Sequence, residues 1–81
     1  MATVPTPEES AREILSIFVN QFKCRSGGVL RINSFNSVWS SRGNATEDFE
    51  PGMRHAAEKD WVEVQPGGHS YKLTDQGFAE A

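Results

Sequence analysis

Few residues of this chain have the type and spacing that active-site chemistry requires. The one cysteine, Cys24, and the two histidines, His55 and His69, are scattered singly, without the Cys-x-x-Cys or His-x-x-x-His spacing of a metal site. We therefore expect no metal and no other cofactor. Neither histidine falls near Cys24 in the fold expected below, so we interpret Cys24 as a small, half-buried helix residue rather than a nucleophile.

The serines and the paired glycines also lack a catalytic frame. Ser34, Ser37, Ser40 and Ser41 lie close together, but no Gly-x-Ser-x-Gly elbow surrounds any of them. Helix capping and a solvated helix face account for them. Gly27-Gly28 lacks the lysine and the spacing of a phosphate loop and is typical of a turn. The sequence predicts no catalytic residues, and we expect the protein not to be an enzyme.

Length and composition favour one ordinary globular domain. The 81 residues are 37% hydrophobic and 23% charged, which allows one small core. The most apolar stretch, Ile14 to Val19, is interrupted by Ser16 and is too short to cross a bilayer, and no signal peptide precedes it. A single cysteine excludes an internal disulfide and suits a reducing compartment. We expect a cytoplasmic protein without a membrane partner.

Charge is distributed unevenly along the chain. The net charge of −3 argues against a generic binder of anionic polymers. Five Lys/Arg and three acids lie from Met1 to Gly43, whereas three Lys/Arg and eight acids lie from Asn44 to Ala81. The second half is therefore the acidic half.

The first predicted element is a helix after a flexible tail over residues 1–5. Thr6 is placed to cap it, Pro7 suits its first position, and Glu9 can complete a capping box. A stripe of apolar residues at helical spacing should face the core. Cations in the last turn should interact favourably with the helix dipole, and Gly27-Gly28 should end the helix. The stripe is Ala11, Ile14, Leu15, Phe18 and Phe22, and the cations are Lys23 and Arg25.

Two short elements should follow. Val29 to Ile32 is a β-prone run that predicts a small strand. Ser34 can cap a second helix, in which Phe35, Val38 and Trp39 share the core face and which Gly43 closes.

A third helix is expected from near Phe49 or Glu50, because Pro51 cannot lie deep inside a helix. Asn44 or Thr46 could cap it, and we expect it to end at a left-handed Asp60. The core side would carry Phe49, Met53, Ala56 and Ala57, and the opposite side Pro51, His55 and Glu58.

The last predicted element is a β-hairpin. Alternation in Trp61 to Gln65 and in Ser70 to Leu73 pairs Val62 with Leu73 and Val64 with Tyr71, with Gly67 and Gly68 at the tip. Pro66 favours a four-residue loop there. Thr74 can cap a final turn over residues 75–81, and Trp39 and Trp61 are expected in the core.

The sequence therefore indicates an α+β fold with three helices, a short strand and a C-terminal hairpin. This order resembles the winged-helix branch of the helix-turn-helix proteins over almost the whole chain. Two motifs are similar to that family: Phe49-x-x-x-Met53-x-x-Ala56-Ala57-x-x-Asp60-Trp61-Val62-Glu63 and Leu73-Thr74-x-x-Gly77. The resemblance implies a single winged-helix domain over residues 6–81, with the hairpin as the wing.

The resemblance also implies a DNA-binding module, such as a transcriptional regulator or accessory protein, because the third helix of such domains enters the major groove and the wing touches the backbone. The positions implied to contact double-stranded DNA are Arg42, Asn44, Thr46, Arg54, His55, Lys59, His69 and Lys72. The wing tip, however, carries no Arg or Lys, and acids surround the start of the third helix.

Those acids support an alternative, a winged-helix protein-interaction module that binds no DNA. Glu47, Asp48, Glu50 and Glu58 would then meet a partner with a basic or apolar surface. Winged-helix regulators often dimerise through an added terminal helix, which is nearly absent here, so we expect a monomer.

Overall fold

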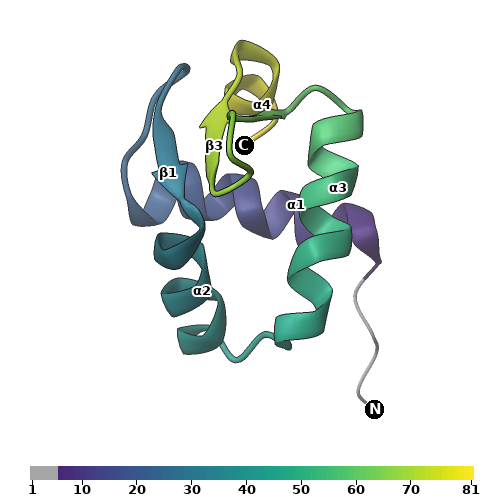
Figure 1. Cartoon of the computed structure of the whole chain (residues 1–81). Helices are drawn as coiled ribbons and strands as arrows, with labels where there is room; N and C mark the ends of the chain where they lie inside the picture. The colour runs from purple at the N-terminus through teal and green to yellow at the C-terminus, as the bar shows by residue number, and fades with distance from the viewer. Residues whose placement is uncertain (1–5) are drawn as a thin grey trace.

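A computed structural model of the chain describes residues 6–81, and the tail expected over residues 1–5 lies outside this range. The fold is α+β, with four α-helices and a three-stranded antiparallel sheet (Figure 1). The α-helices are α1 (Pro7–Ser16), α2 (Ile32–Ser41), α3 (Phe49–Glu58) and α4 (Asp75–Glu80). The strands are β1 (Val29–Arg31), β2 (Val62–Val64) and β3 (Ser70–Leu73), and the short helices are η1 (Ile17–Gln21) and η2 (Thr46–Asp48).

The start of α1 confirms the predicted capping box. The Glu9 amide donates to the Thr6 hydroxyl at 3.2 Å, and the Glu9 carboxylate accepts from the Thr6 amide at 3.2 Å. Two N-terminal amides are therefore satisfied by residues three positions apart.

The predicted end of the first helix was wrong. A π-helical turn, η1, follows α1, and Lys23 takes a left-handed backbone with φ 56°. The Cys24 amide closes the helix on the Phe18 carbonyl at 2.8 Å. Lys23, Cys24 and Arg25 therefore lie outside the helix. Because the π turn adds a residue, it rotates Phe22 off the apolar stripe and leaves it 38% exposed.

The sheet has the order β1-β3-β2, and the hairpin register matches the prediction. Val62 pairs with Leu73 and Val64 with Tyr71. The Gln65 amide donates to the Ser70 carbonyl at 2.9 Å, which closes the predicted four-residue loop. Gly67 and Gly68 have φ of 96° and 73°, values that residues with a side chain rarely adopt.

The predicted N-caps of the second and third helices were also wrong. Helix α2 begins at Ile32, without a side-chain cap, because the Ile32 amide donates to the His69 carbonyl of the hairpin at 2.8 Å. Ser34 therefore lies inside the helix. Neither Asn44 nor Thr46 caps α3, since the 3-10 turn η2 leads directly into it. The predicted first residue, Phe49, is correct, as is the left-handed Asp60 with φ 62°.

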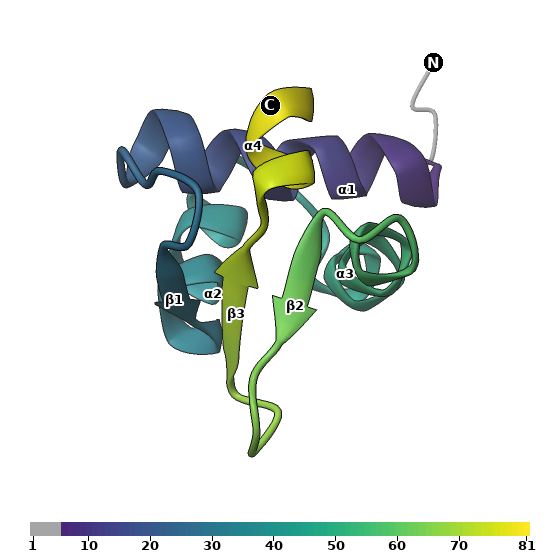
Figure 2. The ribbon, with the colours of Figure 1, turned by 90° about the horizontal axis from the view of Figure 1, so that it is seen from above.

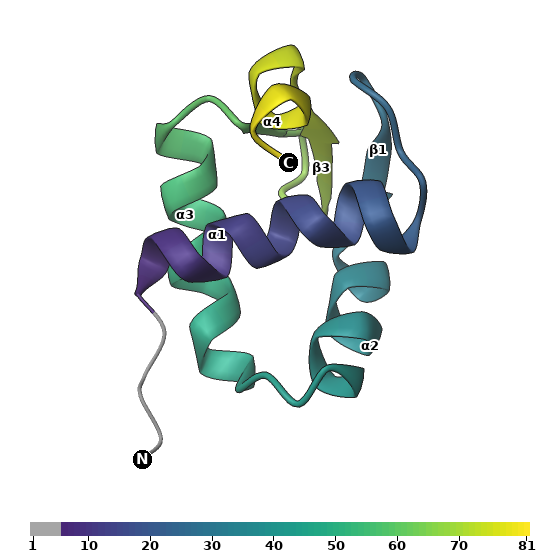
Figure 3. The ribbon, with the colours of Figure 1, turned by 180° about the vertical axis from the view of Figure 1, so that it is seen from behind.

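Helix α1 crosses behind both α2 and α3, and α4 lies beside it (Figures 1 and 3). The hairpin tip projects on the side away from α1 (Figure 2). The core between these layers is aromatic: the ring of Phe35 is fully buried and lies within 5.0 to 5.8 Å, centroid to centroid, of Phe18, Phe49 and Tyr71. Trp39 and Trp61 are buried as predicted.

Two buried glycines allow backbones to approach closely. A Cβ at Gly52 of α3 would lie 2.5 Å from the Cβ of Ser10 in α1. A Cβ at Gly77 of α4 would lie 2.0 Å from the carbonyl oxygen of Trp61. Both distances are shorter than carbon atoms tolerate, so these contacts require glycine.

Candidate interaction surface

The exposed side of α3 carries more acid than base. We call this side the α3 face and define it by Glu47, Glu50, Pro51, Arg54 and Glu58, all exposed. Its only arginine, Arg54, donates to the Glu50 carboxylate at 3.1 Å, one turn away on the same helix. The α3 face therefore has a net negative charge and offers no cation free of an acidic neighbour.

The acids predicted to meet a protein partner all lie on or beside the α3 face. Glu47 and Asp48 are in the turn η2, which precedes α3, and Glu50 and Glu58 lie near the two ends of the helix. Glu47 and Glu58 are exposed and Asp48 is half-buried, and none of these three belongs to an ion pair among residues 6–81.

Of the three residues expected at the start of the third helix, Arg42 and Asn44 are half-buried within the fold. Arg42 ends α2, and its guanidinium pairs with the Glu13 carboxylate of α1. Asn44 is half-buried, with a buried side-chain nitrogen that has no hydrogen-bond partner within residues 6–81. Only Thr46 is exposed. The arginine that was predicted to contact phosphate therefore joins α2 to α1.

His55 is half-buried and lines a cleft together with Pro51 and Glu58, on the side of α3 where it was predicted. Its ring packs edge-on against Trp61, with 6.0 Å between ring centroids. Its Nε2 atom is buried, without a hydrogen-bond partner in the described part of the chain. Pro7 of α1 lines the same cleft as His55.

The other predicted nucleic-acid contacts are separated in space. Lys59 follows the C-terminal end of α3, whereas Arg42 and Thr46 lie at its N-terminal end, about 15 Å away at 1.5 Å per residue. His69 is exposed in the hairpin loop. Lys72 lies between the inward-facing Tyr71 and Leu73 and so projects from the outer face of the sheet. The eight residues do not form one positive patch.

The cations outside ion pairs gather elsewhere. Arg12, Arg42 and Arg54 are the arginines that form ion pairs within residues 6–81. Of the other cations, Arg31 and Lys72 lie on β1 and β3, Lys23 and Arg25 lie in the connection before β1, and Lys59 follows α3. We call Lys23, Arg25, Arg31 and Lys72 the basic sheet surface, although Glu63 lies opposite Lys72 in the sheet and lines one cleft with Lys72 and Asp75. Figure 2 places β1 and α3 at opposite edges of the sheet.

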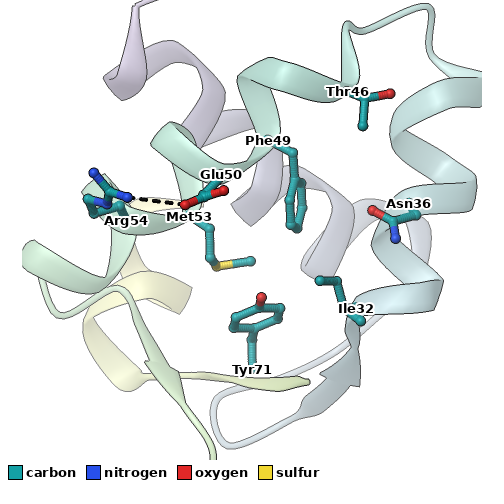
Figure 4. A pocket seen from close by; sticks show the side chains of 8 residues that line it. All are labelled: Ile32, Asn36, Thr46, Phe49, Glu50, Met53, Arg54 and Tyr71. Atoms are coloured by element: carbon teal, nitrogen blue, oxygen red, sulfur yellow. Dashed lines mark hydrogen bonds and ion pairs between the residues drawn. The ribbon is translucent and has the colours of Figure 1, made fainter. Parts of the chain in front are cut away.

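A groove opens between α2 and α3 over the sheet. Its volume is about 440 Å³, and its apolar lining is Ile32, Phe49, Met53 and Tyr71. Its polar lining is Asn36, Thr46, Glu50 and Arg54. Figure 4 shows these side chains around one space, with the Tyr71 ring as the floor. We call this space the α2–α3 groove.

The hydroxyl of Tyr71 is the polar group at the floor of the α2–α3 groove. Tyr71 is 7% exposed, and its hydroxyl points toward the groove interior without a hydrogen bond to the other seven lining side chains (Figure 4). Burial, and then the nearby carboxylate of Glu50, raise the pKa of Tyr71 because both disfavour the phenolate. The hydroxyl is therefore a protonated donor at neutral pH.

No arrangement for metal or nucleophilic chemistry is found in the described part of the chain. Residues 6–81 contain no group of three or more His, Cys, Asp or Glu side chains that could hold a metal ion. Cys24 is half-buried, and burial raises the pKa of its thiol, which disfavours the reactive thiolate. No helix within residues 6–81 has both the length and the apolar character needed to cross a membrane.

Comparison with known proteins gives no relative from which a function could be transferred. No family model, no curated protein and no solved structure matches this chain. The arrangement of its own side chains therefore carries the functional argument.

Sequence reasoning missed the α2–α3 groove and the basic sheet surface. The groove joins residues from four segments between Ile32 and Tyr71, which no local pattern connects. Its one available signal was Tyr71, a single tyrosine on the inward side of the hairpin. The basic sheet surface could not be found because the first-helix prediction placed Lys23 and Arg25 in the helix.

Proposed function

We propose that this protein is a winged-helix domain that binds another protein through the α3 face. The order of helices and strands, the hairpin register and the joining of β1 to β3 support the winged-helix assignment. The observation that carries the binding proposal is the charge state of α3, where the single arginine is paired and Glu47, Asp48 and Glu58 are not. Such a surface attracts a basic partner and repels the phosphates of DNA.

A titration with hexalysine tests this proposal. The isotopically labelled chain should show salt-dependent amide shifts confined to residues 46–58, and the double variant Glu47→Lys, Asp48→Lys should lose most of them. Glu63→Lys, a charge reversal on the exposed outer face of the sheet, is the matched control and should leave them in place. Shifts of equal size around Glu63 and Asp75 would show that the α3 face has no special role.

DNA binding through the basic sheet surface is the second candidate. It is favoured by Lys23, Arg25, Arg31 and Lys72, which form no ion pair within residues 6–81 and lie away from the acids of α3. Each phosphate that they neutralise would add almost one unit to the salt slope of binding, roughly 0.9 per contact.

A gel shift on mixed-sequence duplex DNA at low salt tests the second candidate. Retardation that Arg31→Glu abolishes and that Arg54→Glu leaves unchanged would support it. The absence of retardation at low salt would remove DNA from consideration.

A single species of monomer mass in sedimentation is expected in both cases, and a dimer would contradict the expected monomer.

A further inference from the structure

We propose that the α2–α3 groove receives a bulky apolar side chain of the protein partner, from a peptide segment in which that side chain is next to Lys or Arg. This inference rests on the proposed function and makes it more specific: the α3 face supplies the charge, and the groove supplies the anchor point.

The floor of the groove is suited to an apolar side chain. Ile32, Phe49 and Met53 present carbon and sulfur atoms around the Tyr71 ring (Figure 4). The volume of about 440 Å³ falls within the roughly 300–1,000 Å³ typical of ligand pockets. Interfaces commonly derive most of their affinity from one such side chain in a well-formed pocket.

The Tyr71 hydroxyl indicates that the occupant also brings a hydrogen-bond acceptor. Its residue is more than nine-tenths buried, and the hydroxyl points into the groove without a hydrogen bond to the other lining side chains. The hydroxyl oxygen is not among the buried side-chain atoms of residues 6–81 that lack a partner, so water reaches it, and an acceptor on the occupant would replace that water. Each peptide residue carries a backbone carbonyl, so a peptide meets this requirement next to any apolar side chain.

The charge around the groove selects a cationic segment. Residues 46–54 border the groove and carry Glu47, Asp48 and Glu50 against the single cation Arg54. Within the lining, Glu50 and Arg54 pair with each other, so the charge near the groove comes from the residues next to it in the chain: Glu47 and Asp48 beside Thr46 and Phe49, against Arg31 beside Ile32, which leaves a net charge of −1. An acidic peptide or a nucleic acid would be repelled there, whereas Lys or Arg beside the anchoring side chain would be attracted.

Three capped hexapeptides separate the parts of this proposal. They are Lys-Lys-Leu-Leu-Lys-Lys, the same peptide with two central alanines, and Glu-Glu-Leu-Leu-Glu-Glu. Each is titrated into the labelled full chain, and the Met53 methyl and the Tyr71 ring are followed by NMR. We expect saturable shifts at both with the first peptide alone.

Two variants of the chain give the matched comparison. Asn36→Arg places a cation at the groove and should weaken the first peptide several-fold, whereas Ser37→Arg, also exposed on α2 but not at the groove, should leave its affinity within about twofold. Tyr71→Phe keeps the ring and removes the donor, and should weaken it roughly fivefold.

The remaining outcomes overturn the proposal in distinguishable ways. Equal shifts on the α3 face with the leucine and alanine peptides, without movement of Met53, would refute the groove and leave the proposed function standing. Equal binding of the glutamate peptide would refute the charge selection. No response to any of the three peptides, together with no response to hexalysine, would refute both the groove and the proposed function.

Discussion

The α3 face and the basic sheet surface differ in whether their charged side chains are held in ion pairs. On the α3 face the arginine is held by a neighbouring carboxylate and acids remain, whereas on the basic sheet surface the cations remain outside ion pairs. Both regions contain charges of both signs, since Glu63 and Asp75 lie beside Lys72. Their partners within the fold determine which sign faces solvent, and a position on a helix or strand therefore does not by itself identify a recognition surface.

The largest loss of stability that we expect from a single substitution is at the sheet end of the molecule. Gly77→Ala would force a Cβ to within 2.0 Å of the Trp61 carbonyl oxygen, so backbone must move. We expect a loss of about 3 kcal/mol in the free energy of unfolding, measured by urea denaturation. Hydrogen exchange should increase first in α4 and around β2. Stability equal to that of the original chain would show that α4 is not held against Trp61.

A somewhat smaller loss is expected at the helical end. Gly52→Ala places a Cβ 2.5 Å from the Ser10 Cβ, at the point where α1 and α3 cross, and should cost about 2 kcal/mol in urea denaturation. Exchange should increase in α3 while the hairpin keeps its protection. Ser37→Ala, on the exposed side of α2, is the control and should be nearly neutral. Uniform loss of protection would mean that the two ends unfold as one unit.

The ion pairs of Arg42 and Arg54 should contribute differently to the free energy of unfolding. The Arg42–Glu13 pair is part-buried, with side chains 26% and 32% exposed, and joins α2 to α1, whereas the Arg54–Glu50 pair is 70% and 81% exposed within one helix. Arg42→Ala should lower stability by about 1 kcal/mol and Arg54→Ala by less than about 0.5 kcal/mol, as measured by thermal unfolding. The reverse order would contradict the structural role given to Arg42.

The smallest effect concerns the titration of the groove tyrosine. The pKa of Tyr71 is raised above its ordinary value near 10, so above that pH the unfolded chain releases its proton before the folded chain does. Stability present at neutral pH should therefore fall as pH rises through this range. Because the chain has one tyrosine, tyrosinate absorbance reports this residue alone. Tyr71→Phe should reduce the fall, and an unchanged fall would assign it to other groups.

Local contacts explain which parts of the fold could be predicted from sequence. The capping box joins residues three positions apart, and the hairpin register follows from alternation around a glycine turn, so both were predicted correctly. The start of α2 was not, because its first amide bonds to His69, far along the chain. The π turn after α1 also has no signature in the hydrophobic pattern.

The candidate site was harder to predict for the same reason. Arg42 and Glu13 are 29 positions apart, and no sequence rule removes that arginine from the list of phosphate contacts. The periodicity of α3 predicted the side on which His55 lies, but it could not predict that the His55 ring packs against Trp61. Glu47, Asp48 and Glu50 lie around the start of α3 as the pattern indicated, although the caps predicted there do not form.

The Trp39 indole nitrogen, which donates to the Ala45 carbonyl at 2.7 Å, ties the connection between α2 and α3 to the buried side of α2. The distance between α2 and α3, which form the walls of the groove, is thus set by the Trp39 indole and by the phenyl rings of the core. Asn36 and Thr46, at the upper margin, are exposed and have no part in that core. Phe49, Met53 and Tyr71 belong both to the core and to the groove floor, so evolution or design can change binding preference without loss of stability only at the margin residues.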